Sequence, residues 1–99
     1  MTGPRIEARL TGEDDRHFDL AVTVREGESA TTHQVTLSRD HHHRYATAHE
    51  SPEDLVVRCF EFLLRREPKE SILRRFDIGQ IEDYFPEFED VIGAPSRED

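Results

Sequence analysis

The sequence predicts a single α+β domain in which a three-stranded antiparallel meander precedes one long and two short helices. Two observations predict this class. Three segments within the first 38 residues alternate apolar and polar side chains with period two, which is typical of half-buried strands. Residues 51–68 then carry helix start and stop signals around a long apolar stretch. With 99 residues, 34% of them apolar, the chain is long enough for one modest core and too short for a second domain.

The three strands are expected at about residues 5–10, 17–25 and 32–38. Polar, glycine-containing connectors of hairpin length separate them, which favours a meander with one solvated face. His33 falls on an apolar strand face, where a satisfied, half-buried histidine is expected rather than a ligand. The apolar faces of the three strands are formed by Ile6, Ala8 and Leu10, by Phe18, Leu20, Val22 and Val24, and by His33, Val35 and Leu37.

The long helix is expected at about residues 52–67. Ser51 can cap it, Pro52 suits its first position and Pro68 ends it. Its apolar residues span about 220° of the helical wheel, whereas a surface helix needs only about 100°. We therefore expect this helix to be covered on two sides, by the sheet and by the segments that follow it. Cys59 lies inside the apolar arc, which predicts a buried core thiol rather than a catalytic one.

The remaining segments are predicted from weaker patterns. Residues 39–50 have no clean period and are expected to connect sheet and helices, with room for one helical turn. Two short helices are expected at about residues 69–76 and 77–85. The folded domain is expected to span residues 1–92, with a frayed tail at 93–99.

Charge is distributed unevenly along the chain. The net charge is −9, which disfavours a general nucleic-acid binder because such binding depends on neutralising phosphates. Residues 58–75 carry six basic and three acidic side chains, whereas residues 77–90 carry six acids and no base. Such runs are usually solvated faces. The alternative is a surface that steers a partner into place.

The sequence predicts no membrane association and no enzyme. No apolar run approaches the roughly 18 residues of a membrane span, and the first residues lack an apolar signal segment, so a cytoplasmic protein is expected. No Gly-x-Ser-x-Gly elbow or glycine-rich phosphate loop is present, and nothing selects two carboxylates as an acid–base pair. We expect no catalytic residues and no cofactor.

Two alternative functions are a metal-responsive regulator, which would use the histidine loop 41–49, and a nucleic-acid-associated regulator, which would use the arginine face 58–75. The loop resembles a metal site in composition, although consecutive side chains diverge, and clustered histidines could also respond to pH. Its candidate ligands are His41, His42, His43 and His49. Residues 70–85 loosely match a helix-turn-helix, but its second helix would bring carboxylates to phosphates. Nucleic acid would then contact Arg65, Arg66, Arg74 and Arg75 instead.

Three segments also resemble a group of short uncharacterised prokaryotic proteins. They are Ser51-Pro52-Glu53-Asp54-Leu55, residues 66–77 (REPKESILRRFD) and Tyr84-Phe85-Pro86-Glu87-Phe88. The resemblance covers roughly residues 51–88. It implies a strand-rich N-terminal half joined to this helical signature, and it implies no established activity and no catalytic residue.

These patterns favour a small interaction or regulatory module that binds a protein partner through its acidic, aromatic C-terminal surface. Core packing explains most of the aromatic residues there, and an exposed aromatic cluster with a polar rim would be a binding site. Tyr84, Phe85 and Phe88 are the expected anchors, and the rim is formed by Glu82, Asp83, Glu87 and Glu89. A homo-oligomer stays open, since an exposed sheet edge would let two copies pair.

Overall fold

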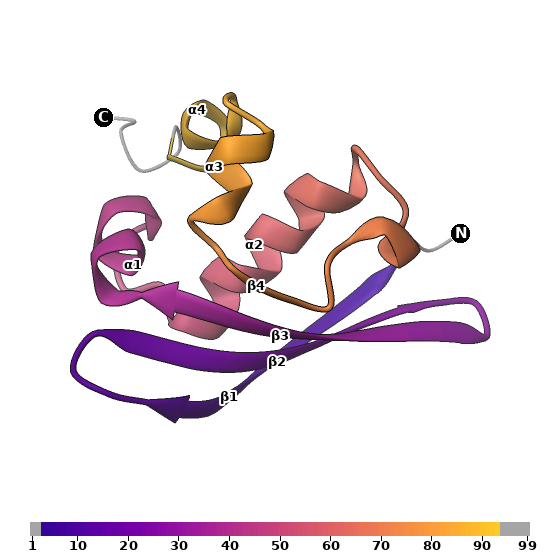
Figure 1. The fold of residues 1–99 in the computed structure, drawn as a ribbon, viewed down its shortest axis with the longest axis horizontal. Coiled ribbons are helices and arrows are strands. Elements are labelled where there is room, and N and C mark those ends of the chain that lie inside the picture. The colour runs from indigo at the N-terminus through magenta and orange to yellow at the C-terminus, as the bar shows by residue number, and fades with distance from the viewer. Residues whose placement is uncertain (1–2, 94–99) are drawn as a thin grey trace.

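The computed structural model describes residues 3–93 and confirms the α+β class. Strands β1 (Arg5–Glu13), β2 (His17–Glu26) and β3 (Ser29–Ser38) form the predicted antiparallel meander. A fourth strand, β4 (Arg75–Asp77), pairs in parallel with β3, so the sheet order is β1-β2-β3-β4. All the helices lie on one face of this sheet (Figure 1). Among the described residues, none of the helices is both long and apolar enough to cross a membrane.

The meander follows from its alternation. In β2 the even-numbered residues from Phe18 to Val24 are buried, and their odd-numbered neighbours face the open side of the sheet. β2 and β3 pair without interruption from His17 with Ser38 to Glu26 with Ser29. Gly27 opens the two-residue turn between them with a φ of 64°, a conformation that glycine adopts without steric cost.

Helix α2 (Pro52–Leu64) confirms the predicted start signals, because the Ser51 hydroxyl accepts a hydrogen bond from the amide of Asp54 at 3.1 Å. It ends three residues before the predicted position. The amides of Arg66 and Glu67 both donate to the carbonyl of Leu63, which closes the helix in a turn, and Pro68 disfavours helical backbone at Glu67. Its two sides are covered as expected. The ring of Phe60 lies 5.9 Å from that of Phe76 of β4, and the ring of Phe62 lies 5.1 Å from that of Phe88.

Helix α1 (Arg39–Tyr45) occupies much of the segment expected to be a connector. The Ser38 hydroxyl caps it by accepting from the amide of His41 at 3.0 Å. Its sequence shows no helical period because Tyr45 is the buried residue of the helix.

The predicted helix over residues 69–76 is wrong. That segment forms one 3₁₀ turn (Lys69–Ser71) and then enters the sheet as β4. The amide of Gln34 donates to the carbonyl of Arg74 at 2.7 Å, and the amide of Ile78 donates to that of Thr36 at 2.9 Å. The free edge of β3 thus supplies backbone partners that override local helix preference.

The C-terminal segment forms two short helices, α3 (Gln80–Tyr84) and α4 (Phe88–Gly93). α3 begins three residues later than predicted, because residues 75–77 belong to β4. Gly93, expected in the frayed tail, is the last residue of α4. The rest of that predicted tail, residues 94–99, lies outside the described part of the chain.

The core lies between the sheet and α2. Leu20, Val22, Val24 and Leu37 from the sheet and Leu55, Val56 and Phe60 from α2 have no exposed surface. Cys59 is buried with them, as predicted, and burial raises the pKa of its thiol to about 12.

Candidate functional site

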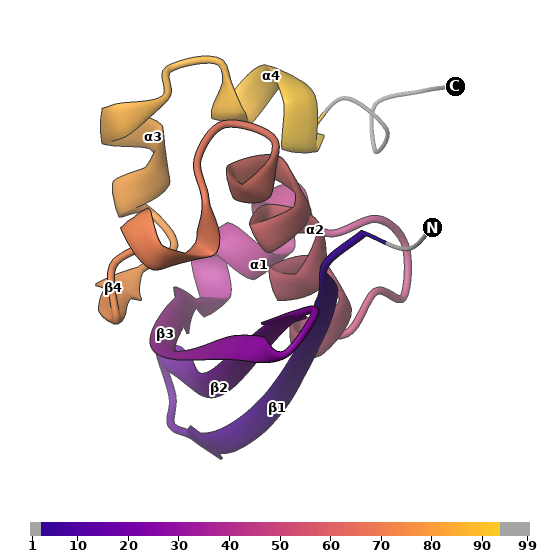
Figure 2. The ribbon, with the colours of Figure 1, turned by 90° about the vertical axis from the view of Figure 1, so that its right-hand side faces the viewer.

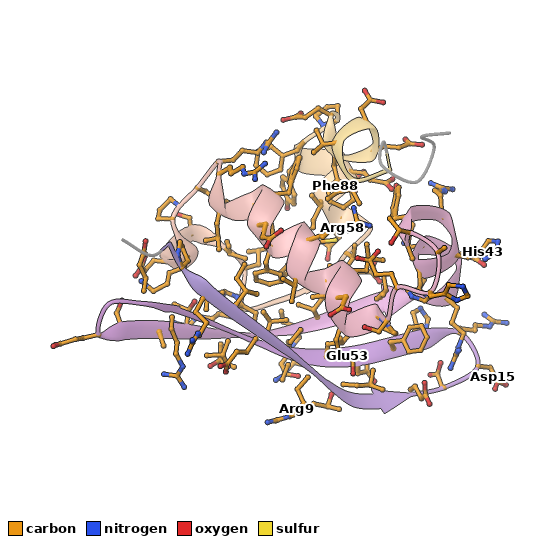
Figure 3. All side chains as sticks on the ribbon, turned by 180° about the vertical axis from the view of Figure 1, so that it is seen from behind. Arg9, Asp15, His43, Glu53, Arg58 and Phe88 are labelled. Atoms are coloured by element: carbon orange, nitrogen blue, oxygen red, sulfur yellow. The ribbon has the colours of Figure 1, made fainter. Side chains whose placement is uncertain are left out.

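The predicted anchors separate into surface and core. Tyr84 is 64% exposed, and Phe85 is half-buried with its ring edge-on to Phe62 at 5.8 Å. Phe88 is fully buried between Phe62 and Tyr45, so its prediction as an exposed anchor is wrong. The reason is its place on α4, where it shares the buried side with Ile92, one turn away. Figure 3 shows Phe88 pointing from α4 toward α2.

An apolar groove of about 220 Å³ lies between the end of α2, the segment before β4, and α3. Among residues 3–93, three large apolar side chains stand exposed, and two of them, Leu73 (49%) and Tyr84 (64%), line this groove. We call it the Leu73–Tyr84 groove. Its walls are formed by Leu63, Glu67, Ser71, Ile72, Leu73, Phe76, Gln80, Ile81, Tyr84 and Phe85.

Leu73 was not predicted as a surface residue. As part of a helix over residues 69–76 it would lie on the apolar face with Ile72 and Phe76. In the extended backbone before β4, however, Ile72 and Phe76 turn inward and Leu73 remains exposed. No signal in the sequence identifies this, because the extended conformation depends on pairing with β3.

His33 fixes the backbone of this wall. Its Nδ1 lies 2.8 Å from the carbonyl oxygen of Leu73, and its Nε2 lies 2.8 Å from the hydroxyl of Thr31. Because a carbonyl only accepts, we assign the ring proton to Nδ1, and Nε2 then accepts from Thr31. His33 is fully buried rather than half-buried, and this burial lowers its pKa below the ordinary range.

Two of the predicted acidic rim residues are engaged within the molecule. Glu82 accepts a hydrogen bond from the hydroxyl of Tyr45 and lies 3.8 Å from both His41 Nε2 and an Arg44 nitrogen. Glu87 accepts from Arg66 Nε at 3.0 Å. The other two, Asp83 and Glu89, are exposed. Glu67, which was not predicted, supplies a carboxylate at the groove itself.

The structure does not bring the four candidate histidines together. His41 stacks on Tyr45, His42 donates from Nε2 to the carbonyl of Glu50 at 2.8 Å, and His43 and His49 are exposed. Figure 3 shows His43 pointing outward from α1. No group of three or more histidine, cysteine, aspartate or glutamate side chains in the described chain is arranged to hold a metal ion.

The four candidate arginines do not form one face either. Arg66 lies 3.6 Å over the ring of Phe62 while it bonds Glu87. Arg75 alternates with the buried Phe76 in β4, so it lies on the open face of the sheet, opposite the helices. Arg65 and Arg74 are exposed.

Arg58 joins α2 to the end of α1, to the segment that follows α1, and to α4. Its guanidinium donates to both carboxylate oxygens of Glu50 at 2.8 and 2.9 Å, to the carbonyl of Tyr45 at 3.0 Å and to that of Ile92 at 2.9 Å. Figure 3 shows it on α2, facing α4. Burial opposes ionisation of Glu50, but hydrogen bonds from Arg58 and from the amide of Thr47 bring its pKa below the ordinary value. No pattern in the sequence predicts this pair.

Comparison of the chain with protein-family models, with curated proteins and with solved structures gives no significant match.

Proposed function

We propose that this chain is a small, non-enzymatic cytoplasmic interaction module that binds a protein partner in the Leu73–Tyr84 groove. The observation that carries the proposal is the exposure of Leu73 and Tyr84 on the two sides of one apolar groove. An exposed apolar patch rimmed by polar residues marks an interaction site, and tyrosine is one of the side chains that most often anchor a protein interface.

The size of the groove favours a protein over a small molecule. Its volume of about 220 Å³ lies below the roughly 300–1,000 Å³ of sites that enclose drug-sized ligands. Few polar groups converge in it, since the lining residues with polar side-chain atoms are Glu67, Ser71, Gln80 and Tyr84. A groove of this size suits a few apolar side chains of a docked segment.

Charge defines the chemistry of the partner further. Glu67 lies in the groove wall, Asp83 lies beside Tyr84 on α3, and residues 77–90 contain no base. Opposite charge steers association and fixes register more than it adds affinity. Arg74, the exposed neighbour of Leu73, gives the opposite wall a positive charge. We therefore propose a partner segment that places apolar side chains in the groove and carries lysine or arginine on the side that faces α3.

Photo-crosslinking tests the proposal directly. A benzophenone amino acid at position 84 is expected to form an adduct with one discrete protein in cells of the native source. The matched control carries the same group at Val91, which is 42% exposed and lies outside the groove. Equal adducts from both positions, or none from position 84, would contradict the proposal. An adduct that disappears with nuclease treatment would favour nucleic acid instead.

A further inference from the structure

β1 is a long, unpaired edge of the sheet. It spans nine residues and pairs only with β2 in the described chain, whereas the opposite edge, β4, has three residues. An edge strand of this length presents a row of unpaired backbone donors and acceptors. Figure 3 shows β1 crossing the front of the molecule, with Arg9 pointing away from the helices.

The core is also incompletely covered along this edge. Ile6, Ala8 and Leu10 face the core from β1 but remain partly exposed, while Leu20 and Val22, two of their partners on β2, have no exposed surface. A further strand beside β1 would cover these three side chains.

The sequence of β1 is complementary to itself in the antiparallel register centred on Ala8. Residues opposite each other in an antiparallel pair point to the same face, so the two strands must pair even-numbered residues with even and odd with odd. With the two-fold axis at Ala8, Glu7 lies opposite Arg9 of the second copy on the open face. On the core face, Ile6 then lies opposite Leu10 of the second copy.

The registers with the two-fold axis one residue away, at Glu7 or at Arg9, bring like charges together. An axis at Glu7 would place Glu7 opposite Glu7 and Arg5 opposite Arg9, and an axis at Arg9 would place Arg9 opposite Arg9. Like charges directly opposite each other destabilise a pair of strands. In the described chain, no ion pair engages Glu7 or Arg9 within one copy.

We propose that two copies of this chain associate through their β1 strands, paired around Ala8, to form one continuous eight-stranded sheet. The inference goes beyond the proposed function and stands independently of it. A two-fold axis perpendicular to the sheet keeps both sets of helices on the same face. β1 and β4 are opposite edges of the sheet, with α3 near the β4 side (Figure 2), so both Leu73–Tyr84 grooves stay open.

Sedimentation and light scattering of the purified chain test this proposal, and a dimer is expected. Glu7→Arg and Arg9→Glu each create two like-charged pairs across the axis, so each is expected to weaken the dimer about tenfold or more. The double variant Glu7→Arg/Arg9→Glu restores opposite charges and is expected to recover the wild-type Kd. A monomer at every concentration, or a double variant no tighter than the single ones, would overturn the proposal.

A cysteine at the axis provides a second measurement that does not depend on charge. Opposed Cα atoms in antiparallel strands are about 4.5–5.5 Å apart, within the range of about 4.4–6.8 Å that a disulfide spans. Ala8→Cys is expected to give a disulfide-linked dimer under mild oxidation. Arg5→Cys is the control, because its two thiols would sit six residues out of register, about 20 Å apart. Equal crosslinking from both positions would overturn the register.

Discussion

His33 bonds the carbonyl oxygen of Leu73 across 40 residues of sequence, at 2.8 Å from its Nδ1. Through this contact β3 fixes the backbone of a groove wall. Because both ring nitrogens of His33 are partnered and the side chain is fully buried, the contact is a structural requirement with consequences for stability and for pH dependence.

His33→Ala is expected to lower the free energy of unfolding by about 3 kcal/mol, because it leaves a cavity and removes the buried partners of Leu73 and Thr31. Urea unfolding followed by circular dichroism measures the change. Thr32→Ala, on the exposed side of the same strand, is the matched control and is expected to change stability by less than about 0.5 kcal/mol. Equal losses in both variants would contradict the assigned role.

The same residue predicts a pH dependence. Burial lowers the pKa of His33 in the folded chain, so the unfolded chain binds its proton first as pH falls. The contribution of neutral, buried His33 to the free energy of unfolding is therefore complete above the ordinary histidine pKa of about 6.5. It is lost as pH falls through that value toward the lower pKa of the folded chain. For one proton, the free energy of unfolding changes by at most about 1.4 kcal/mol per pH unit.

His33→Gln, which keeps a donor for Leu73 and cannot charge, isolates this effect. The free energy of unfolding, measured from about pH 7.5 down to about pH 5.5, one unit either side of that ordinary pKa, is expected to decline less in the variant than in the wild type. Identical slopes would assign the pH dependence to the other five histidines instead.

The strands and α2 were predictable because their signals are local. Period two marks a strand with one buried face, and Ser51, Pro52 and Pro68 mark the ends of α2. β4 was missed because Phe76 fits the apolar face of a helix as well as it fits the buried face of a three-residue strand. Only pairing with β3 decides between helix and strand for this segment. α1 was missed because Tyr45 alone of its residues is buried.

The candidate site was predictable only in part, for a related reason. Aromatic density marked the C-terminal segment but did not separate Tyr84, which is exposed, from Phe88, which packs on Tyr45 and Phe62. Leu73 and its contact with His33 depend on residues 40 positions apart, which no local pattern reports.

Arg58→Met is expected to cost about 3 kcal/mol of stability. The substitution leaves the Glu50 carboxylate, only 10% exposed, without its charged partner, and it removes donors from the carbonyls of Tyr45 and Ile92. The control is Arg65→Met at the exposed C-cap of the same helix, which is expected to change stability by less than about 0.5 kcal/mol. Adding Glu50→Gln to Arg58→Met is expected to recover part of the loss; a further loss would contradict this account of the pair.

Cys59 is expected to be unreactive in the folded chain. Burial both excludes reagents and raises the pKa of its thiol to about 12, so the thiolate is scarce at neutral pH. A thiol-specific chromogenic disulfide is expected to label it only after denaturation. Rapid labelling in native buffer would show that α2 opens readily from the sheet.

Partner binding in the Leu73–Tyr84 groove is tested most directly by two aspartate substitutions of exposed apolar residues, one inside the groove and one outside it. Leu73 and Val91 are similarly exposed, at 49% and 42%, but only Leu73 lines the groove. The measurement is the affinity of the wild type, of Leu73→Asp and of Val91→Asp for the protein that crosslinks at position 84. Leu73→Asp is expected to bind about tenfold or more weakly than the wild type, and Val91→Asp is expected to bind as the wild type does. Equal affinity of all three proteins would show that the Leu73–Tyr84 groove is not the binding surface.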